Sequence, residues 1–522
     1  MIEFEVRDRD LLARIGRLKT RNGIIETPIF LPVINPVKDV VAPKILWEDF
    51  GCKALITNAY ITRKHFSKEA EEKGIHNILG FPGVIMTDSG AYQILAYGSI
   101  DVTNEEIIRY QENIGSNIAT ILDVPTGWNV SLEYAKYTVE ETLRRARELE
   151  RLKSRADIAW VGPIQGGCYI DLVATSAMEM GKLSFDIYAL GSPTPVMEQY
   201  LFTTLVDMIF AAKMNIPVNH PFHLFGAGHP FMFSLIVALG CDLFDSAAYS
   251  IFARENRYLT EYGTMRLEDL KYLPCSCPIC TKRDVKDFIE MPHDEREKEL
   301  SKHNLYVCFT EIRRIKQAIS EGRLWEYMEM RVNSHPSLLQ ALKRLHKYSK
   351  YIEVSSPSVK KKGLFFFSSI DLARPEVIRY AERLKERYTP PKWAKVLLLI
   401  PDDESKSNRK RKRLKKIASM VHKRFNLDLD SIHLCFYSLP FGVIPIELSE
   451  TYPLYQYEYA YPPDSDIKEY TIERIIEYVS NTAYTTIIIS FEENAWSENL
   501  ADLLIKKLSE CKIRVEILTL SI

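Results

Sequence analysis

The sequence has no long apolar run. Its longest apolar stretches, such as residues 231–239, are far shorter than the roughly 20 residues that a membrane-spanning helix needs. The first ten residues, MIEFEVRDRD, carry acidic side chains where an export signal would have basic residues and an apolar segment. We therefore expect a cytoplasmic protein with no membrane partner.

Two glycine-rich phosphate-binding signatures are also missing. The sequence contains no Walker-type loop, and no GxGxxG motif follows the first expected strand. Nucleotide hydrolysis and dinucleotide-dependent redox chemistry are therefore disfavoured.

Neither sign of charge is in excess. The 68 Lys and Arg residues nearly balance the 69 Asp and Glu residues, which leaves a formal net charge of −1. Two local runs are nevertheless strongly basic, at residues 360–362 and 409–416. A solvated helix face is the usual explanation for such a run, and binding to a polyanion is the alternative. The sequence leaves both explanations open.

What is present describes a large globular protein. Of the 522 residues, 46% are hydrophobic and 26% are charged, which is ordinary for a chain with an ample core. At about 150 residues per domain, this length suggests about three domains, or one large barrel with additions.

Residues 1–340 repeat one pattern, in which a short apolar run is followed by a turn and a helix-like segment. One such segment, residues 131–153, begins with Ser131 as a good N-cap. This alternation predicts a parallel sheet, and eight units predict an α/β fold of the (β/α)8 TIM-barrel type, with a doubly wound open sheet as the alternative. The apolar runs are residues 28–32, 54–57, 84–87, 119–122, 158–161, 187–190, 222–225 and 242–244.

The remaining chain is organised more coarsely. Residues 341–395 are mixed in character and are expected to form a small α+β linking domain. Residues 396–522 again alternate strand-like and helix-like segments, which predicts an α/β accessory domain.

Three of the nine cysteines lie within the segment PCSCPIC, at residues 274–280. A disulfide is disfavoured in a reducing compartment, and a redox pair of Cys277 and Cys280 is possible chemistry. The additional Cys275 and the later His303 favour structural zinc, because zinc takes four Cys and His ligands in a tetrahedron. His293 is the weaker candidate for the fourth ligand. A Cys3His set leaves no open position for substrate, so the zinc would stabilise a loop and take no part in the chemistry.

Polar residues and glycines follow most of the expected strands. In a (β/α)8 barrel the strand ends carry the chemistry, so these residues would converge on one rim. Taken singly, each has a plainer explanation: an Asp after a strand is often a helix N-cap, and Tyr92 and Phe225 are as readily explained by core packing. The candidate residues are Asp88, Tyr92, Asp123, Gln165, Gly191, Ser192, Phe225 and Asp245.

This set of side chains restricts the chemistry. Two aspartates that flank one bond suit glycosidic cleavage, one as the nucleophile and the other as the proton carrier. An Asp and a Gln can hydrogen-bond to the edge of a heterocycle, and aromatic rings can stack on its faces. The residues therefore predict a glycosidase or glycosyl-exchange site for a nucleobase.

Seven segments of the chain resemble the tRNA-guanine transglycosylase family, and specifically its archaeal branch. They are MTDSGAYQ (86–93), LDVPTGW (122–128), PIQGG (163–167), YALGSP (188–193), HLFGAGHP (223–230), DLFDSAAY (242–249) and PCSCPIC (274–280). The segment PFGVIPIELSETYPLYQYE (440–458) resembles the accessory region of that branch.

The resemblance implies a reaction without ATP or redox cofactors. Guanine 15 in the D-arm of tRNA would be replaced by 7-cyano-7-deazaguanine, the first tRNA-level step towards archaeosine. Asp245 would attack ribose C1′ and form a covalent intermediate, and Asp88 would move the proton of each base. An assignment of the nucleophile to Asp88 stays open, so both aspartates are expected to be catalytic.

The other site residues are carried over in the same way. Asp123, Gln165 and the backbone of Gly191 and Ser192 would contact the edge of the base, and Tyr92 and Phe225 would stack on it. The zinc ligands of the family are matched by Cys275, Cys277, Cys280 and His303, which would fix a barrel insertion at about residues 265–305 that helps to dock tRNA. The expected partners are tRNA, guanine, 7-cyano-7-deazaguanine and a second copy of the chain in a homodimer.

One departure from the archaeal branch concerns the RNA-binding PUA domain with which many members end. No basic, glycine-rich segment of that kind is evident before residue 522. Either the module is absent, or a separate PUA-type protein supplies it.

Two other functions compete with base exchange. One is the archaeosine synthase type of paralogue, which modifies a base that is already in tRNA. The other is a non-catalytic tRNA-binding subunit. The presence of both Asp88 and Asp245 favours the transglycosylase.

Overall fold

The computed structural model describes residues 2–38, 40–93, 101–402, 407–427, 431–493, 495–509 and 514–520. The chain divides into two compact units, Met1–Tyr348 and Ser349–Ile522, which we call the barrel unit and the C-terminal unit. The finer division expected from the sequence, at residues 340 and 395, stays a prediction.

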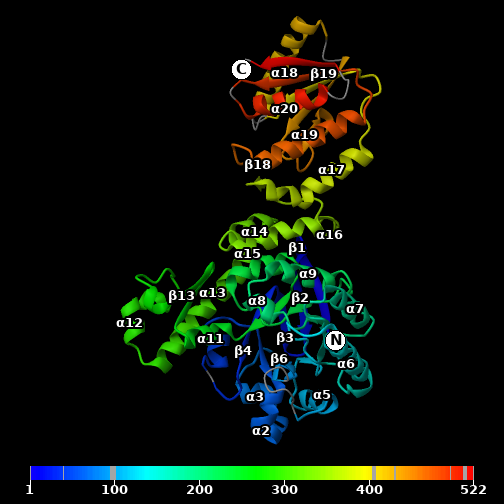
Figure 1. Ribbon diagram of the computed structural model, residues 1–522. Coiled ribbons are helices and arrows are strands. Elements are labelled where there is room, and N and C mark those ends of the chain that lie inside the picture. The colour runs from blue at the N-terminus through cyan, green and yellow to red at the C-terminus, as the bar shows by residue number, and fades with distance from the viewer. Residues whose placement is uncertain are drawn as a thin grey trace. The chain divides into compact units, whose positions relative to one another are not determined.

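A closed barrel of parallel strands forms the centre of the barrel unit (Figure 1). Its strands follow one another around the barrel in chain order, and the last pairs with the first through Asp245 and Leu31. Each strand contains or overlaps one of the predicted apolar runs, so the predicted barrel is confirmed and the open sheet is wrong. Within the described residues the strands are β4 (Ile29–Ile34), β5 (Ala54–Asn58), β6 (Val84–Asp88), β7 (Ile118–Thr120), β8 (Ala159–Ile164), β9 (Ile187–Leu190), β10 (Phe222–Leu224) and β11 (Leu243–Ser246).

Helices connect the strands. The predicted helix after β7 is α6 (Leu132–Leu152), and Ser131 Oγ accepts a hydrogen bond from the backbone N–H of Tyr134, as an N-cap does. The other connecting helices are α1 (Pro43–Glu48), α2 (Ala59–Lys73), α3 (Ile75–Leu79), α5 (Asn104–Asn113), α7 (Ile170–Met180), α8 (Thr194–Glu198), α9 (Phe202–Lys213) and α10 (Phe233–Ala238).

The amino-terminal residues form a sheet that the sequence pattern did not reveal. Strands β1 (Glu3–Asp10), β2 (Ala13–Thr20) and β3 (Gly23–Thr27) pair antiparallel in chain order. Leu18 and Ile25 are buried in the same hydrophobic cluster as the inward side chains of the barrel strands. The sheet therefore covers part of the barrel interior. Most of its charged side chains, such as Glu3 and Arg17, are exposed, whereas Asp10 is buried and accepts a hydrogen bond from the backbone N–H of Leu324.

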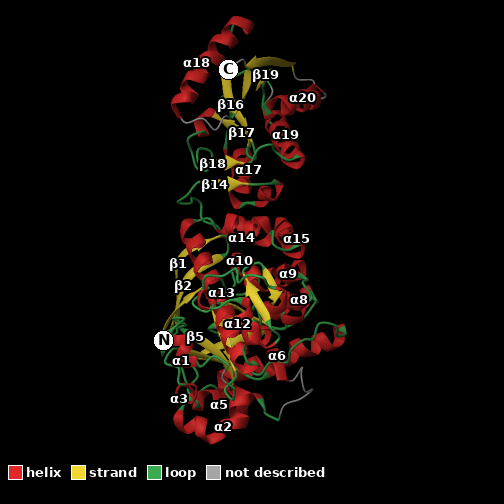
Figure 2. Cartoon of the chain, turned by 90° about the vertical axis from the view of Figure 1, so that its left-hand side faces the viewer, coloured by secondary structure: helices red, strands yellow, loops and turns green. Residues whose placement is uncertain are grey.

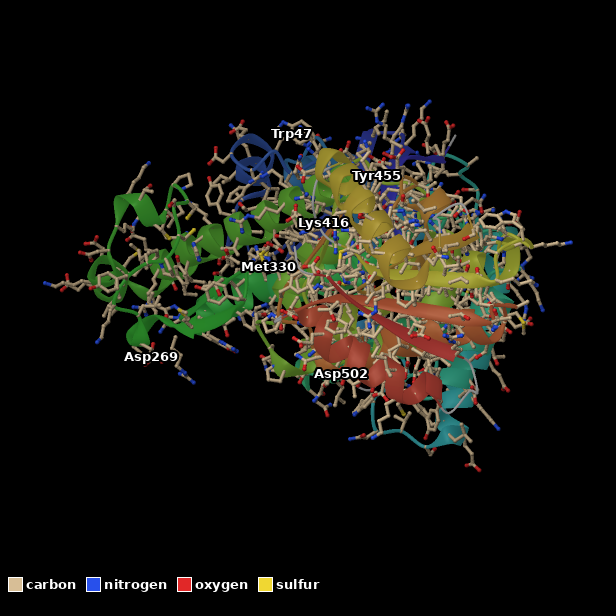
Figure 3. All side chains as sticks on the ribbon, turned by 90° about the horizontal axis from the view of Figure 1, so that it is seen from above. Trp47, Asp269, Met330, Lys416, Tyr455 and Asp502 are labelled. Atoms are coloured by element: carbon tan, nitrogen blue, oxygen red, sulfur yellow. The ribbon has the colours of Figure 1, made fainter. Side chains whose placement is uncertain are left out.

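An insertion follows β11. It consists of α11 (Ala248–Arg254), the hairpin of β12 (Arg257–Thr260) and β13 (Gly263–Arg266), the cysteine-rich loop and α12 (Val285–Glu290). Figure 3 shows Asp269, which is exposed, on the outer edge of this insertion. The insertion has a small core of its own, which includes Tyr258, Phe288 and Leu300.

The long helix α13 (His293–Glu321) runs from the insertion to the barrel. Its residue Phe309 packs against Phe30 and Phe50 of the barrel, with ring centroids 6.2 and 5.7 Å apart. Two further helices, α14 (Leu324–Val332) and α15 (Pro336–Arg344), complete this unit.

The C-terminal unit is built on a five-stranded sheet with the order β17-β16-β15-β19-β20. Among the described strands of this sheet, β17 alone runs antiparallel to its neighbour. Figure 2 shows α18 on one side of the strands and α20 on the other, so the sheet lies between layers of helices. The elements are β15 (Val396–Pro401), α18 (Ser407–Phe425), β16 (Ile432–Ser438), β17 (Gly442–Pro445), α19 (Ser465–Ser480), β19 (Thr486–Glu492), α20 (Trp496–Ser509) and β20 (Arg514–Leu520).

Residues 349–395 share the core of this sheet. Leu364 and Phe366 of β14 (Leu364–Phe366) and Tyr380 of α17 (Pro375–Arg387) belong to one buried cluster with the strands of the sheet. Strand β14 pairs with β18 (Tyr457–Tyr459), and α16 (Ser349–Ser355) precedes them. Among the described helices of both units, none is long and apolar enough to cross a membrane.

Candidate active site and metal centre

The candidate active-site residues lie at the carboxyl ends of successive barrel strands. Asp88 ends β6, Asp123 and Gln165 follow β7 and β8, and Asp245 lies near the end of β11. Because the strands are parallel and the barrel is closed, these ends form a single rim. The negative charges of Asp123 and Asp245 both raise the pKa of Asp88, so the three carboxyl groups lie close enough to interact electrostatically.

Asp88 is held by two donors. Asn58, at the end of the neighbouring strand β5, donates from Nδ2 to Asp88 Oδ2 over 2.9 Å, and the backbone N–H of Gly90 lies 3.3 Å from the same oxygen. Burial, reinforced by the charges of Asp123 and Asp245, raises the pKa of Asp88 to about 7. A carboxyl group with this pKa can both donate and accept a proton near neutrality.

Asp123 and Gln165 form a buried pair. Gln165 Nε2 donates to Asp123 Oδ2 over 2.5 Å. Gln165 Oε1 accepts from the backbone N–H of Thr126 at 2.9 Å and from Ser192 Oγ at 3.0 Å, which fixes the orientation of the amide. Burial raises the pKa of Asp123 to about 6, although the hydrogen bond from Gln165 opposes this shift.

Gly191 lies directly against this pair. A Cβ atom at this position would come within 2.3 Å of Gln165 Nε2, so any larger residue would displace the amide. The Gly191 N–H already donates to the carbonyl of Ile164 over 2.8 Å. A base at this rim could therefore use the Gly191 carbonyl. Ser192 follows with a φ of 59°, in the left-handed region.

Asp245 is almost fully buried, with 7% exposure. Its Oδ1 atom lies 2.7 Å from His223 Nε2 and accepts a second, longer hydrogen bond from the Gly226 N–H at 3.3 Å. Sequence reasoning did not single out His223 or Asn58. Each is a polar residue in a short and largely apolar strand, and that was the signal in the sequence that could have found them.

The two aromatic candidates occupy different surroundings. Tyr92 is 61% exposed on the segment after β6, whereas Phe225 is partly buried and packs against the barrel core. The Phe225 ring also lies against His223, with centroids 4.6 Å apart. The structure therefore places Phe225 against His223, the residue that contacts Asp245, and it leaves Tyr92 exposed to solvent.

The predicted metal ligands gather in the insertion. The ligand atoms of Cys275, Cys277, Cys280 and His303 all lie within 4.8 Å of one another. His303 Nδ1 lies 3.5 Å from Cys277 Sγ and 3.3 Å from Cys280 Sγ. His293 is outside this group, at the exposed start of α13.

The surroundings of His303 fit a metal ligand. Its Nε2 atom lies 2.9 Å from the carbonyl oxygen of Leu259, which fixes the proton there and leaves Nδ1 to face the thiols. The ring stacks on Tyr258 at 3.7 Å, and Tyr258 Oη lies 3.3 Å from Cys280 Sγ. These residues could hold one metal ion. The described cysteines elsewhere form no disulfide.

The two basic runs do not lie wholly on the surface. Lys360 is buried and pairs with Glu376 over 3.0 Å, and Arg413 is buried and pairs with Glu492. Lys361 and Lys362 in the first run, and Lys415 and Lys416 in the second, are exposed. The side chains of residues 409–412 lie outside the described part.

Known proteins that are similar to most of this chain carry the same name. The chain is 42% identical to a tRNA-guanine(15) transglycosylase of Sulfolobus acidocaldarius over 497 residues, which covers 93% of this chain and 95% of that protein. It is 43% identical to the protein of that name from Saccharolobus solfataricus, covering 93% and 96%. For the protein of that name from Methanocaldococcus jannaschii, the identity is 44% and the coverage 87% and 68%.

Two family matches divide the chain. Residues 377–516 match a domain of unknown function that is numbered 5591. Residues 9–337, which contain the barrel, the candidate active site and the cysteine-rich insertion, match the family described as queuine tRNA-ribosyltransferase. The chain therefore belongs to the queuine tRNA-ribosyltransferase family.

Proposed function

We propose that this chain exchanges a base in tRNA, replacing guanine 15 with 7-cyano-7-deazaguanine at the rim of the barrel. The observation that carries the proposal is the convergence of Asp88, Asp123 and Asp245 on one rim. Three carboxylates around one spot suit a reaction that needs a nucleophile, a proton carrier and a contact to a base. Relatives that are named tRNA-guanine(15) transglycosylase and span nearly the whole chain support the same reaction.

Asp245 is the proposed nucleophile. One of its oxygens attacks ribose C1′ as the bond to guanine breaks, and the departing guanine takes a proton from Asp88. The incoming base gives a proton back to Asp88 and attacks C1′, which releases Asp245. The pKa of Asp88, at about 7, supports its role as both donor and acceptor of that proton.

The pair of Asp123 and Gln165 is proposed to contact the polar edge of the base. The amide of Gln165 has a fixed orientation, and Asp123 offers a carboxylate beside it. Ser192 and the Gly191 carbonyl are proposed to complete this edge, with Phe225 and Tyr92 stacking on the base. Displacing a fixed polar group costs affinity, so these contacts would select among purines.

The ion in the Cys3His group is proposed to be a single structural zinc. The sulfur and nitrogen donors are those that zinc prefers, and four protein ligands leave no open position for a substrate. The ion would fix the loop of residues 275–280 against α13.

The remaining parts of the proposal concern location and assembly. We propose that the enzyme acts in the cytoplasm as a homodimer on tRNA, and that a separate PUA-type protein aids binding of tRNA. Chromatography with light scattering would report the mass of the enzyme. Exchange assays with and without such a protein would report its contribution.

A guanine-exchange assay tests the central proposal. Purified protein is incubated with unmodified tRNA and radioactive guanine, and label in the tRNA is measured. We expect incorporation at position 15, and competition by 7-cyano-7-deazaguanine. A folded protein that binds tRNA without incorporating guanine would favour the tRNA-binding subunit and contradict the proposal.

A further inference from the structure

The contact between His223 and Asp245 gives the candidate nucleophile a defined orientation. His223 lies on β10 and pairs in register with Leu243 of β11, so Asp245 lies two residues further along the same face of β11. This geometry puts His223 Nε2 2.7 Å from Asp245 Oδ1. The Gly226 N–H approaches the same oxygen at 3.3 Å. Both contacts fall on Oδ1, and Oδ2 has no hydrogen-bond partner among the described residues.

The other ring nitrogen of His223 fixes the proton on Nε2. His223 is fully buried, and its Nδ1 has no hydrogen-bond partner among the described residues. An N–H group at Nδ1 would be buried without an acceptor. Burying a lone pair there without a donor costs less free energy. The proton therefore lies on Nε2, directed at Asp245 Oδ1. An N–H donor in this position orients the carboxylate.

We propose that His223 is a positioning residue for the exchange reaction, holding Asp245 Oδ1 so that Oδ2 is free to attack the ribose. The inference rests on the proposed function. Oδ2 donates its electron pair to C1′ as the C1′–N9 bond breaks, the pair of that bond leaves with guanine, and Asp88 supplies the proton. Oδ1 becomes the carbonyl oxygen of the ester and keeps its contact with His223.

The hydrogen bond from His223 is stronger to the carboxylate than to the ester, because a charged acceptor gains more from a donor. In the second half of the reaction the incoming base attacks C1′, the C1′–Oδ2 bond breaks, and its electron pair returns to Asp245. His223 therefore favours the free carboxylate over the covalent adduct. Removing the donor should slow turnover and also increase the share of enzyme that is held as the adduct.

A matched pair of amide substitutions isolates this donor. In His223→Gln the amide nitrogen can reach the position of Nε2, whereas in His223→Asn it lies near the position of Nδ1 and cannot reach Asp245. His223→Phe removes every polar atom. The control is His220→Phe, just before the amino end of β10, where the ring packs against Tyr188.

The measurements are kcat and KM for guanine exchange, and the fraction of enzyme that migrates as a tRNA adduct on denaturing gels at fixed guanine. We expect His223→Asn and His223→Phe to lower kcat roughly 10- to 100-fold at a similar KM for tRNA, and to raise the ratio of adduct to free enzyme by about five-fold. For His223→Gln, both kcat and the ratio of adduct to free enzyme should stay within a few-fold of the wild-type values. For His220→Phe, both should equal the wild-type values.

Equal kcat and adduct ratio in the Asn and Gln variants would overturn the inference, as would a change in KM alone. This comparison holds even if the Phe variant does not fold. If the wild-type chain exchanges no guanine, the proposed function itself fails. If wild type exchanges guanine and all His223 variants match it, only the role of His223 fails.

Discussion

Asn58 binds a helix and the candidate proton carrier with one side chain. Its Oδ1 accepts from the backbone N–H of Ile61 over 2.9 Å and caps α2, while its Nδ2 donates to Asp88 Oδ2 over 2.9 Å. The same Nδ2 donates to Gln93 Oε1 at 2.9 Å. Because the cap fixes which end of the amide faces the helix, the donor end must face Asp88.

Replacing this donor with a carboxylate should change the pH dependence of exchange. Asn58→Asp keeps the cap but puts a second negative charge beside Asp88, which favours the protonated form of Asp88. We expect the limb of the pH–rate profile that reports Asp88 to move upward by about one unit. Asn58→Ser is the control, since it keeps a cap without adding charge. Identical pH–rate profiles for both variants and wild type would show that Asn58 does not influence the ionisation of Asp88.

Asp245→Asn should abolish base exchange and leave tRNA binding nearly unchanged. The amide preserves the shape of the side chain but is a very poor nucleophile, so the covalent step fails. Denaturing gels should show a tRNA adduct for wild type and none for the variant. The exposed Asp171→Asn in α7 is the control and should form the adduct normally. An adduct of normal yield in Asp245→Asn would instead point to Asp88.

The raised pKa of Asp88 has a consequence for stability. In the folded protein Asp88 holds its proton up to about pH 7, whereas the unfolded chain releases it near the ordinary value of 3.8. The unfolded state therefore binds fewer protons between these values, so the free energy of unfolding falls as the pH rises from about 4 to 7. Ionised Asp88 thus destabilises the folded protein above that window.

Asp88→Asn should accordingly raise the melting temperature at pH 8, by an amount equivalent to roughly 1–2 kcal/mol after allowance for partial solvent exposure. The gain should disappear near pH 4, where wild-type Asp88 is protonated in both states. Calorimetry at several pH values would measure it. A variant that is less stable than wild type at pH 8 would contradict the assigned cause of the shift.

Cys277→Ser should lower both metal content and stability. Binding energy at a closed metal site contributes directly to folding, so losing one thiolate should cost several kcal/mol. Metal analysis and thermal melting would measure both effects, and Cys168→Ser, which changes a cysteine outside the group, is the control. A wild-type protein that keeps its melting temperature after complete removal of metal would rule out a structural ion.

Charge reversal at Lys361 and Lys362, or at Lys415 and Lys416, should weaken tRNA binding and flatten its dependence on salt. Neutralising phosphates releases counterions, so fewer contacts give a shallower salt slope. Lys360→Met is the contrast: it leaves Glu376 buried beside Arg374 with one partner fewer, and should lower stability instead. Binding across a salt series would measure the slope. Unchanged salt slopes in both double variants would mean that these lysines are ordinary solvated side chains that do not contact tRNA phosphates.

The barrel was predictable because parallel strands buried on both faces appear as short apolar runs bounded by turn residues. The amino-terminal sheet was not, since EFEVRDRD alternates charged residues with few apolar ones and resembles a solvated segment. Lys360 and Arg413 were misjudged for a related reason. Their partners, the buried Glu376 and the partly exposed Glu492, are distant in sequence or in another element, and only the fold brings them together.

In the candidate site, too, some features were predictable from the sequence and others were not. The rim position of residues in motifs at strand ends was predictable, because the ends of parallel barrel strands converge whatever the details of packing. His223 and Asn58 were missed, because the role of a polar residue within an apolar strand depends on its neighbour on the adjacent strand, and the register decides which residue that neighbour is.

The single helix α13 contributes His303 to the metal centre and Phe309 to the packing against the barrel, so it connects the two directly. His303 and Phe309 are six residues apart, or about 9 Å along the axis. The insertion is therefore not a detachable module: excising it together with α13 would uncover Phe30 and Phe50. A minimal catalytic barrel engineered from this chain would have to keep the helix, and a helix kept without its metal anchor would fray from the end nearest the cysteines.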